Sequence, residues 1–100
     1  MIPINKVKDL ISKHKLLEND LSAGAIDKKK FAEKSKEYSD LNEIVGNAKD
    51  YISYQKEKEE LEKILNDNST DEELKKMANL ELIELLNKHE ANEKKLKLFL

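Results

Sequence analysis

Apolar residues recur along this chain at the three- and four-residue spacing that places them on one face of a helix. In the first stretch this face carries Ile4, Val7, Leu10, Ile11, His14, Leu17 and Leu21. Pro3 suits the entrance of a helix, because its fixed φ and missing N–H do no harm there, and Gly24 suits the exit. The pattern predicts a first helix over residues 4–22.

The second stretch runs from Asp27 to about Leu65 and contains no proline and one glycine, Gly46. Its apolar seam consists of Tyr38, Leu41, Val45, Ala48, Ile52 and Gln55. We expect one continuous helix over residues 27–65 with Asp27 as its N-cap, and at about 1.5 Å per residue it would reach roughly 60 Å. Gly46 costs about 1 kcal/mol relative to alanine inside a helix, so it indicates a bend or the close approach of a neighbour.

The turn-forming residues at positions 66–69 separate this seam from a third helical pattern over residues 71–99. Thr70 begins a Thr-Asp-Glu-Glu capping box, which predicts Thr70 as the N-cap of that helix. A connection this short makes the second and third helices antiparallel neighbours. We expect the first helix to pack where the second begins and the third ends, where Tyr38, Phe31, Leu96 and Phe99 would meet Ile11, Leu17 and Leu21.

The sequence thus predicts an all-α fold, an elongated three-helix bundle with a long antiparallel helical hairpin, in a single domain over residues 1–100. Apolar residues make up 38% of the chain and charged residues 40%, so the core must be thin. Cysteine is absent, which excludes a disulfide framework and fits a reducing, cytoplasmic location. The apolar runs are too short for a membrane span. The apolar end at Leu98, Phe99 and Leu100 predicts a fragment of a longer protein.

The charge of the chain is nearly balanced, with 19 lysines against 21 acidic residues and a formal net charge of −2. No overall field therefore draws the chain to nucleic acid. Arginine, the residue that contacts bases and phosphates in a bidentate way, is absent. These features argue against sequence-specific recognition of nucleic acid.

Candidate chemistry is sparse, because the chain has no glycine-rich phosphate loop and no nucleophile paired by spacing with a base. His14 and His89 would form a metal site only if they converged with carboxylates such as Asp9 or Glu93. The interpretation we favour places both histidines as polar residues in a thin core, since neither has a second histidine four residues away on its helix. We expect no cofactor, no metal and no enzymatic activity.

Two sets of residues are candidates for contact with a partner. Lys28, Lys29 and Lys30 would meet phosphates or an acidic protein, or they would form a solvated helix start. Tyr51 and Tyr54 would anchor a partner, or they would pack against the third helix. The glutamates at 57, 59, 60 and 62 alternate with lysines, which is typical of a solvated face with ion pairs at i, i+4.

Part of the sequence resembles a known family. KHKLLENDLS at residues 13–22 and KKFAEKSKEYSDLNEIV at residues 29–45 are similar to the amino-terminal helical domain of bacterial class I peptide chain release factors. SKEYSDL at residues 35–41 resembles the type that reads UAA and UAG. NLELIELLNKHEANEKKLKLFL at residues 79–100 is similar to the helix that leads into the central domain of the family.

The resemblance implies a docking domain of a translation termination factor, placed near the stalk base and GTPase-associated region of the ribosome. It also implies contact with the class II release factor, a GTPase. Neither the Gly-Gly-Gln loop of the family nor its codon-reading tripeptide has a counterpart in this chain, so no functional residue carries over. The alternative that we keep open is a coiled-coil spacer or homo-oligomerisation module without a ribosomal role.

Overall fold

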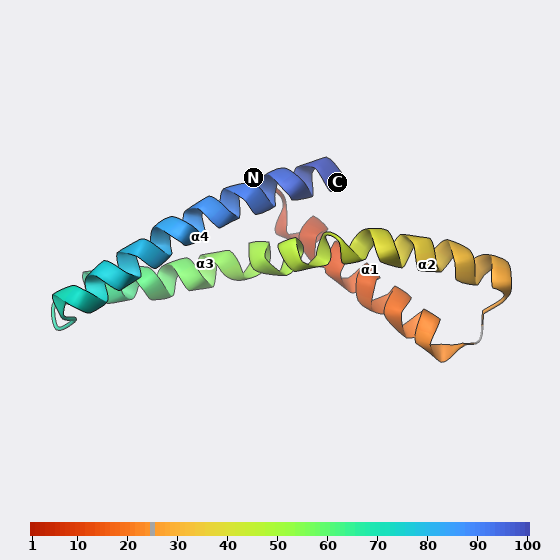
Figure 1. Ribbon diagram of the computed structural model, residues 1–100, viewed down its shortest axis with the longest axis horizontal. Coiled ribbons are helices and arrows are strands. Elements are labelled where there is room, and N and C mark those ends of the chain that lie inside the picture. Colours follow the sequence, from red (N-terminus) through yellow and green to blue (C-terminus); the bar gives the residue numbers. More distant parts are fainter. Residues whose placement is uncertain (25) are drawn as a thin grey trace.

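The computed structural model describes residues 1–24 and 26–100 of the chain. Within those residues the chain forms four helices and no strand, which confirms the all-α prediction. The helices are α1 (Ile4–Ala23), α2 (Lys28–Asn42), α3 (Val45–Asn66) and α4 (Glu72–Phe99). Two of them pair as α1 with α2, and the other two pair as α3 with α4 (Figure 1).

The two helical hairpins lie end to end rather than side by side. Helix α3 continues roughly in the direction of α2, so the two helices form one long spine, with α1 against one half and α4 against the other (Figure 1). The molecule measures 61 × 26 × 20 Å, so the predicted elongated shape is confirmed. Helix α1 also packs against the start of α3, and this contact joins the two hairpins.

The prediction of one continuous helix over residues 27–65 is wrong. Helix α2 ends at Asn42, and the N–H of Ile44 donates to Leu41 O at 3.0 Å in a tight turn before α3 begins. Gly46 lies in the first turn of α3, after the interruption, and a Cβ at this position would meet no atom within 4 Å. No neighbour therefore approaches Gly46 closely, and the break belongs to the residues before it.

The helix ends follow the capping chemistry of the sequence, with one change. Asp27 caps α2 by accepting from Lys30 N at 2.9 Å, and Gly24 follows α1 with a left-handed φ of 67°. The N-cap of α4 is Asp71, which accepts from Leu74 N at 2.8 Å, so the prediction of Thr70 as the cap is wrong. The N–H of Thr70 instead donates to Asp67 O at 3.1 Å and closes the preceding turn.

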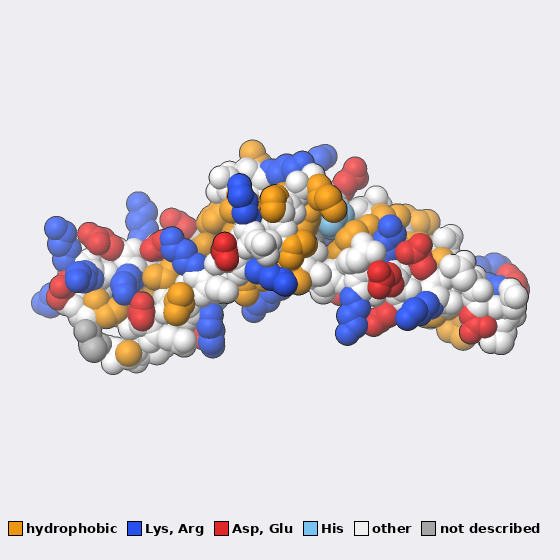
Figure 2. Space-filling view, turned by 180° about the vertical axis from the view of Figure 1, so that it is seen from behind, with side chains coloured by type: hydrophobic (Ala, Val, Ile, Leu, Met, Phe, Trp, Pro, Cys, Tyr) orange, Lys and Arg blue, Asp and Glu red, His pale blue; other side chains and the backbone are white. Residues whose placement is uncertain are grey.

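The core lies where the two hairpins meet. We call this set the junction cluster: Ile2, Val7, Leu10, Leu17, Leu41, Ile44, Ala48, Tyr51 and Leu96. Leu96 of α4 and Val7 of α1 are completely buried in it, and both helices pack against α3. Figure 2 shows apolar side chains gathered over the middle of the molecule, with charged side chains spread along both ends. Of the residues predicted for the helix contact, Leu17 and Leu96 belong to the junction cluster, and Ile11 and Tyr38 pack against it. Phe31 and Phe99 remain 46% and 43% exposed.

Candidate functional site

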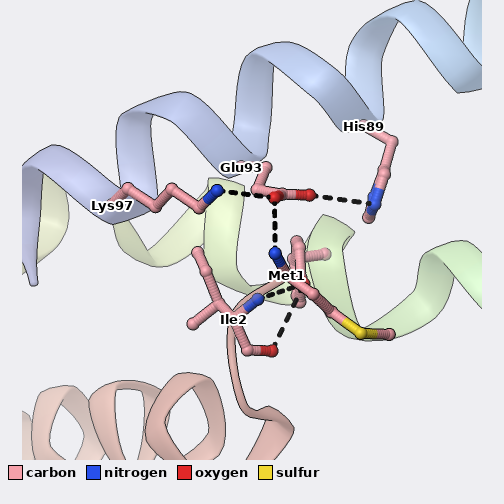
Figure 3. A network of polar contacts seen from close by, with 6 residues as sticks. Met1, Ile2, His89, Glu93 and Lys97 are labelled. Atoms are coloured by element: carbon pink, nitrogen blue, oxygen red, sulfur yellow. Dashed lines mark hydrogen bonds and ion pairs between the residues drawn. The ribbon is translucent and has the colours of Figure 1, made fainter.

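The amino terminus is fastened to α3 and α4 by a network of polar contacts, drawn in Figure 3. The Met1 amino group lies 3.0 Å from Glu93 Oε1, and Lys97 Nζ contacts the same oxygen at 3.0 Å. The hydrogen bond from Lys97 and the one from the Met1 amino group lower the pKa of Glu93 to about 2. The backbone N–H of Ile2 donates to the Tyr51 hydroxyl at 3.0 Å, and that hydroxyl contacts Ile2 O at 3.3 Å.

His89 lies beside this network, between two tyrosine rings of α3. Its ring stacks on Tyr54 with 3.6 Å between the ring centroids, and on Tyr51 with 4.9 Å. Burial lowers the pKa of His89, although Glu93, with Oε2 at 3.7 Å from His89 Nε2, opposes this shift. His89 Nδ1 is buried without a hydrogen-bond partner in the described part of the chain. The neutral ring is thus favoured in the folded protein.

His14 belongs to the other hairpin. Its Nε2 is 2.5 Å from Asn42 Oδ1, and its ring stacks on Tyr38 with centroids 4.7 Å apart. Because α1 and α4 hold the two histidines in different surroundings, the structure does not bring them together. Among residues 1–24 and 26–100, no group of three or more His, Asp or Glu side chains has an arrangement that would hold a metal ion.

The structure places the predicted partner-contact residues in two different environments. Lys28, Lys29 and Lys30 are all exposed in the first turn of α2, at the far end of the α1/α2 hairpin. Tyr51 is 5% exposed and Tyr54 is half-buried, and both rings pack on α4, as the packing alternative predicted. Contact with a partner therefore stays a prediction for the three lysines and for the exposed part of Tyr54.

A groove along the α3/α4 hairpin was not predicted from the sequence. It has a volume of about 520 Å³, and its lining comprises Glu57, Glu60, Leu61, Ile64, Glu81, Glu84, Leu85 and Lys88. Glu57 was expected to pair with a lysine, but its carboxylate accepts from Ser53 Oγ at 3.0 Å. Similarly, Glu59 accepts from Gln55 at 3.2 Å. The spacing within α3 places Glu57 and Glu60 on one face, but only the structure shows the glutamates of α4 opposite them.

None of the helices in the described part of the chain has the length and apolar character that crossing a membrane requires. The fold and these surfaces together define an elongated all-α domain that displays its charged and apolar side chains on two hairpins. The comparison with protein families assigns this domain: the chain belongs to the PCRF domain family, whose model matches residues 10–100.

The relatives of the chain agree with this assignment. Peptide chain release factor 1 of Pelagibacter ubique (strain HTCC1062) is 59% identical over 100 residues, which cover 100% of this chain and 28% of the relative. Peptide chain release factor 1 of Orientia tsutsugamushi (strain Boryong) is 35% identical over 86 residues, covering 86% and 23%. The protein of the same name in Rhizobium rhizogenes (strain K84 / ATCC BAA-868) is 32% identical over 100 residues, covering 99% and 27%.

These similarities confirm the resemblance to class I peptide chain release factors. The chain spans about a quarter of the length of these relatives, from 23% to 28%. No solved structure matches the chain.

Proposed function

We propose that this chain is the amino-terminal helical domain of a translation termination factor and that it docks on the ribosome near the stalk base and GTPase-associated region. The observation that carries the proposal is the family match over residues 10–100, together with similarity to proteins named peptide chain release factor 1. The proposed location is the cytoplasm, and the proposed partners are the ribosome and the class II release factor.

The arrangement of the helices is compatible with docking. The rod is 61 Å long, and it carries the exposed lysines 28, 29 and 30 at one end and the acidic groove of the α3/α4 hairpin toward the other. Its two ends therefore have side chains of opposite charge available for a partner. Because the sequence contains no Gly-Gly-Gln segment, we propose that this chain has no hydrolase activity by itself.

Co-sedimentation with ribosomal particles tests the proposal. We expect the chain to pellet with the particles in a saturable way, more weakly as salt rises, because exposed charges contribute most of such binding. A variant with the same composition but a scrambled order of surface charges is the control. Binding no stronger than that of the control would contradict ribosomal docking.

A second candidate function, homo-oligomerisation, is favoured by one observation. Helix α4 exposes four large apolar side chains, with exposed fractions between 42% and 63%: Met77, Leu80, Ile83 and Leu86. Sedimentation equilibrium separates the two functions. A concentration-dependent dimer that is lost in L80S would support self-association, and a monomer at all concentrations would remove this candidate.

A further inference from the structure

The groove of the α3/α4 hairpin is lined by three apolar side chains, which we call its floor, and by four carboxylates, which we call its rim. Leu61 and Ile64 of α3 and Leu85 of α4 form the floor, and Ile64 keeps 37% of its surface exposed. Met77 is 59% exposed and precedes Glu81 by four residues, so it lies on the same side of α4 and extends the apolar surface toward the tip. Apolar surface in this position is available for a partner to bury.

The rim of the groove is strongly negative. Glu57, Glu60, Glu81 and Glu84 line it, and within residues 1–24 and 26–100 none of them has an ion-pair partner. The one lining lysine, Lys88, is already paired with Asp50 at 3.1 Å. The lysines of α3 at positions 56, 58 and 63 are not part of the lining. The charge of the rim is therefore largely uncompensated.

This combination selects one class of partner. Four carboxylates that line one groove repel the phosphates of a nucleic acid and attract lysine and arginine side chains. The apolar floor lies between two antiparallel helices, a geometry into which an amphipathic helix fits with its apolar face down. A partner that provides both features is a protein helix with an apolar stripe flanked by basic residues.

We propose that the groove formed by Glu57, Glu60, Leu61, Ile64, Glu81, Glu84 and Leu85 binds a basic amphipathic helix of a protein partner. The apolar stripe of that helix packs on the three floor residues, and its basic side chains pair with the rim carboxylates. The proposed function enters this inference at one point: it implies that the partner belongs to the ribosomal assembly. The chemistry of the groove does not depend on that function.

A synthetic peptide serves as the probe. It has about four helical turns, with leucines at i, i+3, i+4, i+7 and i+11 and lysines beside them. The matched control peptide keeps the leucines and replaces each lysine by glutamate. We expect the lysine peptide to bind the chain, with lower affinity at high salt, and the glutamate peptide not to bind.

Paired variants locate the binding in the groove. E60Q together with E84Q is expected to weaken binding of the lysine peptide about fivefold, since exposed ion pairs each contribute modestly. The control with the same charge change, E33Q together with E90Q, alters exposed glutamates outside the groove and should leave the affinity unchanged. For the floor, I64A should weaken binding about threefold, whereas L80A, an exposed residue outside the lining, should not.

Three results would overturn the proposal. The first is equal affinity of the groove variants and their controls for the lysine peptide, with the helical content of all variants unchanged. The second is binding of an RNA duplex that becomes tighter in E60Q/E84Q. That result would show that RNA binds next to the groove and that the carboxylates only repel it. The third is self-association that I64A abolishes in a chain that does not bind the peptide.

The ribosome assay, run on the same variants, separates this inference from the proposed function. If the chain binds ribosomal particles and the groove variants bind equally well, the docking function stands and the groove has no part in it. If the peptide binds in the groove but ribosomal particles do not bind, the groove inference stands and the ribosomal function fails.

Discussion

The junction cluster and the outer part of the α3/α4 hairpin are both built from amphipathic helices, yet they bury very different amounts of side chain. The junction cluster contains nine buried residues from the four helices, the amino-terminal segment and the turn between α2 and α3. The distal arm, defined here as residues 57–88, contains one buried residue, Ala78. Its larger apolar residues are half-buried or exposed.

The difference arises from the number of helices that meet. At the junction α3 contacts α1, α2 and α4, so side chains are covered from several directions. Along the distal arm, α3 packs only against α4. In such a pair, each helix covers one face of its partner and leaves the other faces exposed to solvent. Stability should therefore reside at the junction, and the arm should act mainly as a displayed surface.

The largest effect is expected from removing a junction side chain. L96A empties a completely buried position, so it should lower the free energy of unfolding by about 3 kcal/mol. L61A removes the same atoms from a half-buried position in the distal arm, and it should cost about 1 kcal/mol. Urea titration followed by circular dichroism measures both. Equal losses would show that the arm is as well packed as the junction.

A smaller effect is expected from the hydroxyl that holds the amino-terminal segment. Y51F removes both contacts with Ile2 and leaves its buried N–H without that partner, so it should cost about 1 to 2 kcal/mol. Y54F is the matched control. The Tyr54 ring also stacks on His89, but its hydroxyl makes no hydrogen bond within the described residues. A stability loss in Y54F as large as that in Y51F would contradict the role assigned to the junction.

The third prediction concerns the interruption between α2 and α3, and here the substitution is expected to stabilise the fold. G46A places a methyl group in open space within the first turn of α3, so it should raise the free energy of unfolding by about 0.5 kcal/mol. The break at residues 43 and 44 should persist, because Ile44 is buried in the junction cluster. Chemical shifts of the backbone would detect a merged helix in G46A, and that result would make glycine the cause of the break.

The smallest effect is expected from titration of His89. Its pKa is lowered in the folded state, so the unfolded chain binds the proton more readily, and stability should fall as the pH drops below about 6.5. H89F should flatten this slope while keeping an aromatic ring between Tyr51 and Tyr54. Melting temperatures measured from pH 7.5 to 5 test it, since Glu93, with a folded pKa of about 2, stays ionised there. Parallel slopes in both proteins would contradict the prediction.

Much of the fold could be predicted because it depends on local pattern. The apolar seams predicted α1 and α4 almost to the residue. Asp27 could be predicted as a cap because capping is local: its side chain accepts from the N–H of Lys30, three residues further on. The break after Asn42 could not be predicted, because Glu43 and Ile44 are ordinary helix residues. Burial of Ile44 together with Leu41 and Ala48 is a tertiary effect that local propensity does not contain.

The candidate site was less predictable for the same reason. Asp71 and Thr70 are both good caps, and the turn that engages the N–H of Thr70 leaves Asp71 at the helix entrance. The contact between Met1 and Glu93 joins the two ends of the sequence, and no local pattern indicates it. The groove likewise requires the relative rotation of α3 and α4, which the sequence leaves open because residues 55–60 contain no apolar side chain to continue the seam.

Amide hydrogen exchange of the free chain, resolved by residue, tests most directly whether one junction supports two thinly packed hairpins. We predict the slowest exchange at the amides around Val7 to Leu17, Ala48 to Ile52 and Asn92 to Leu96, and exchange that is faster by an order of magnitude or more over the distal arm. Protection as strong along residues 60–85 as at the junction would contradict this account.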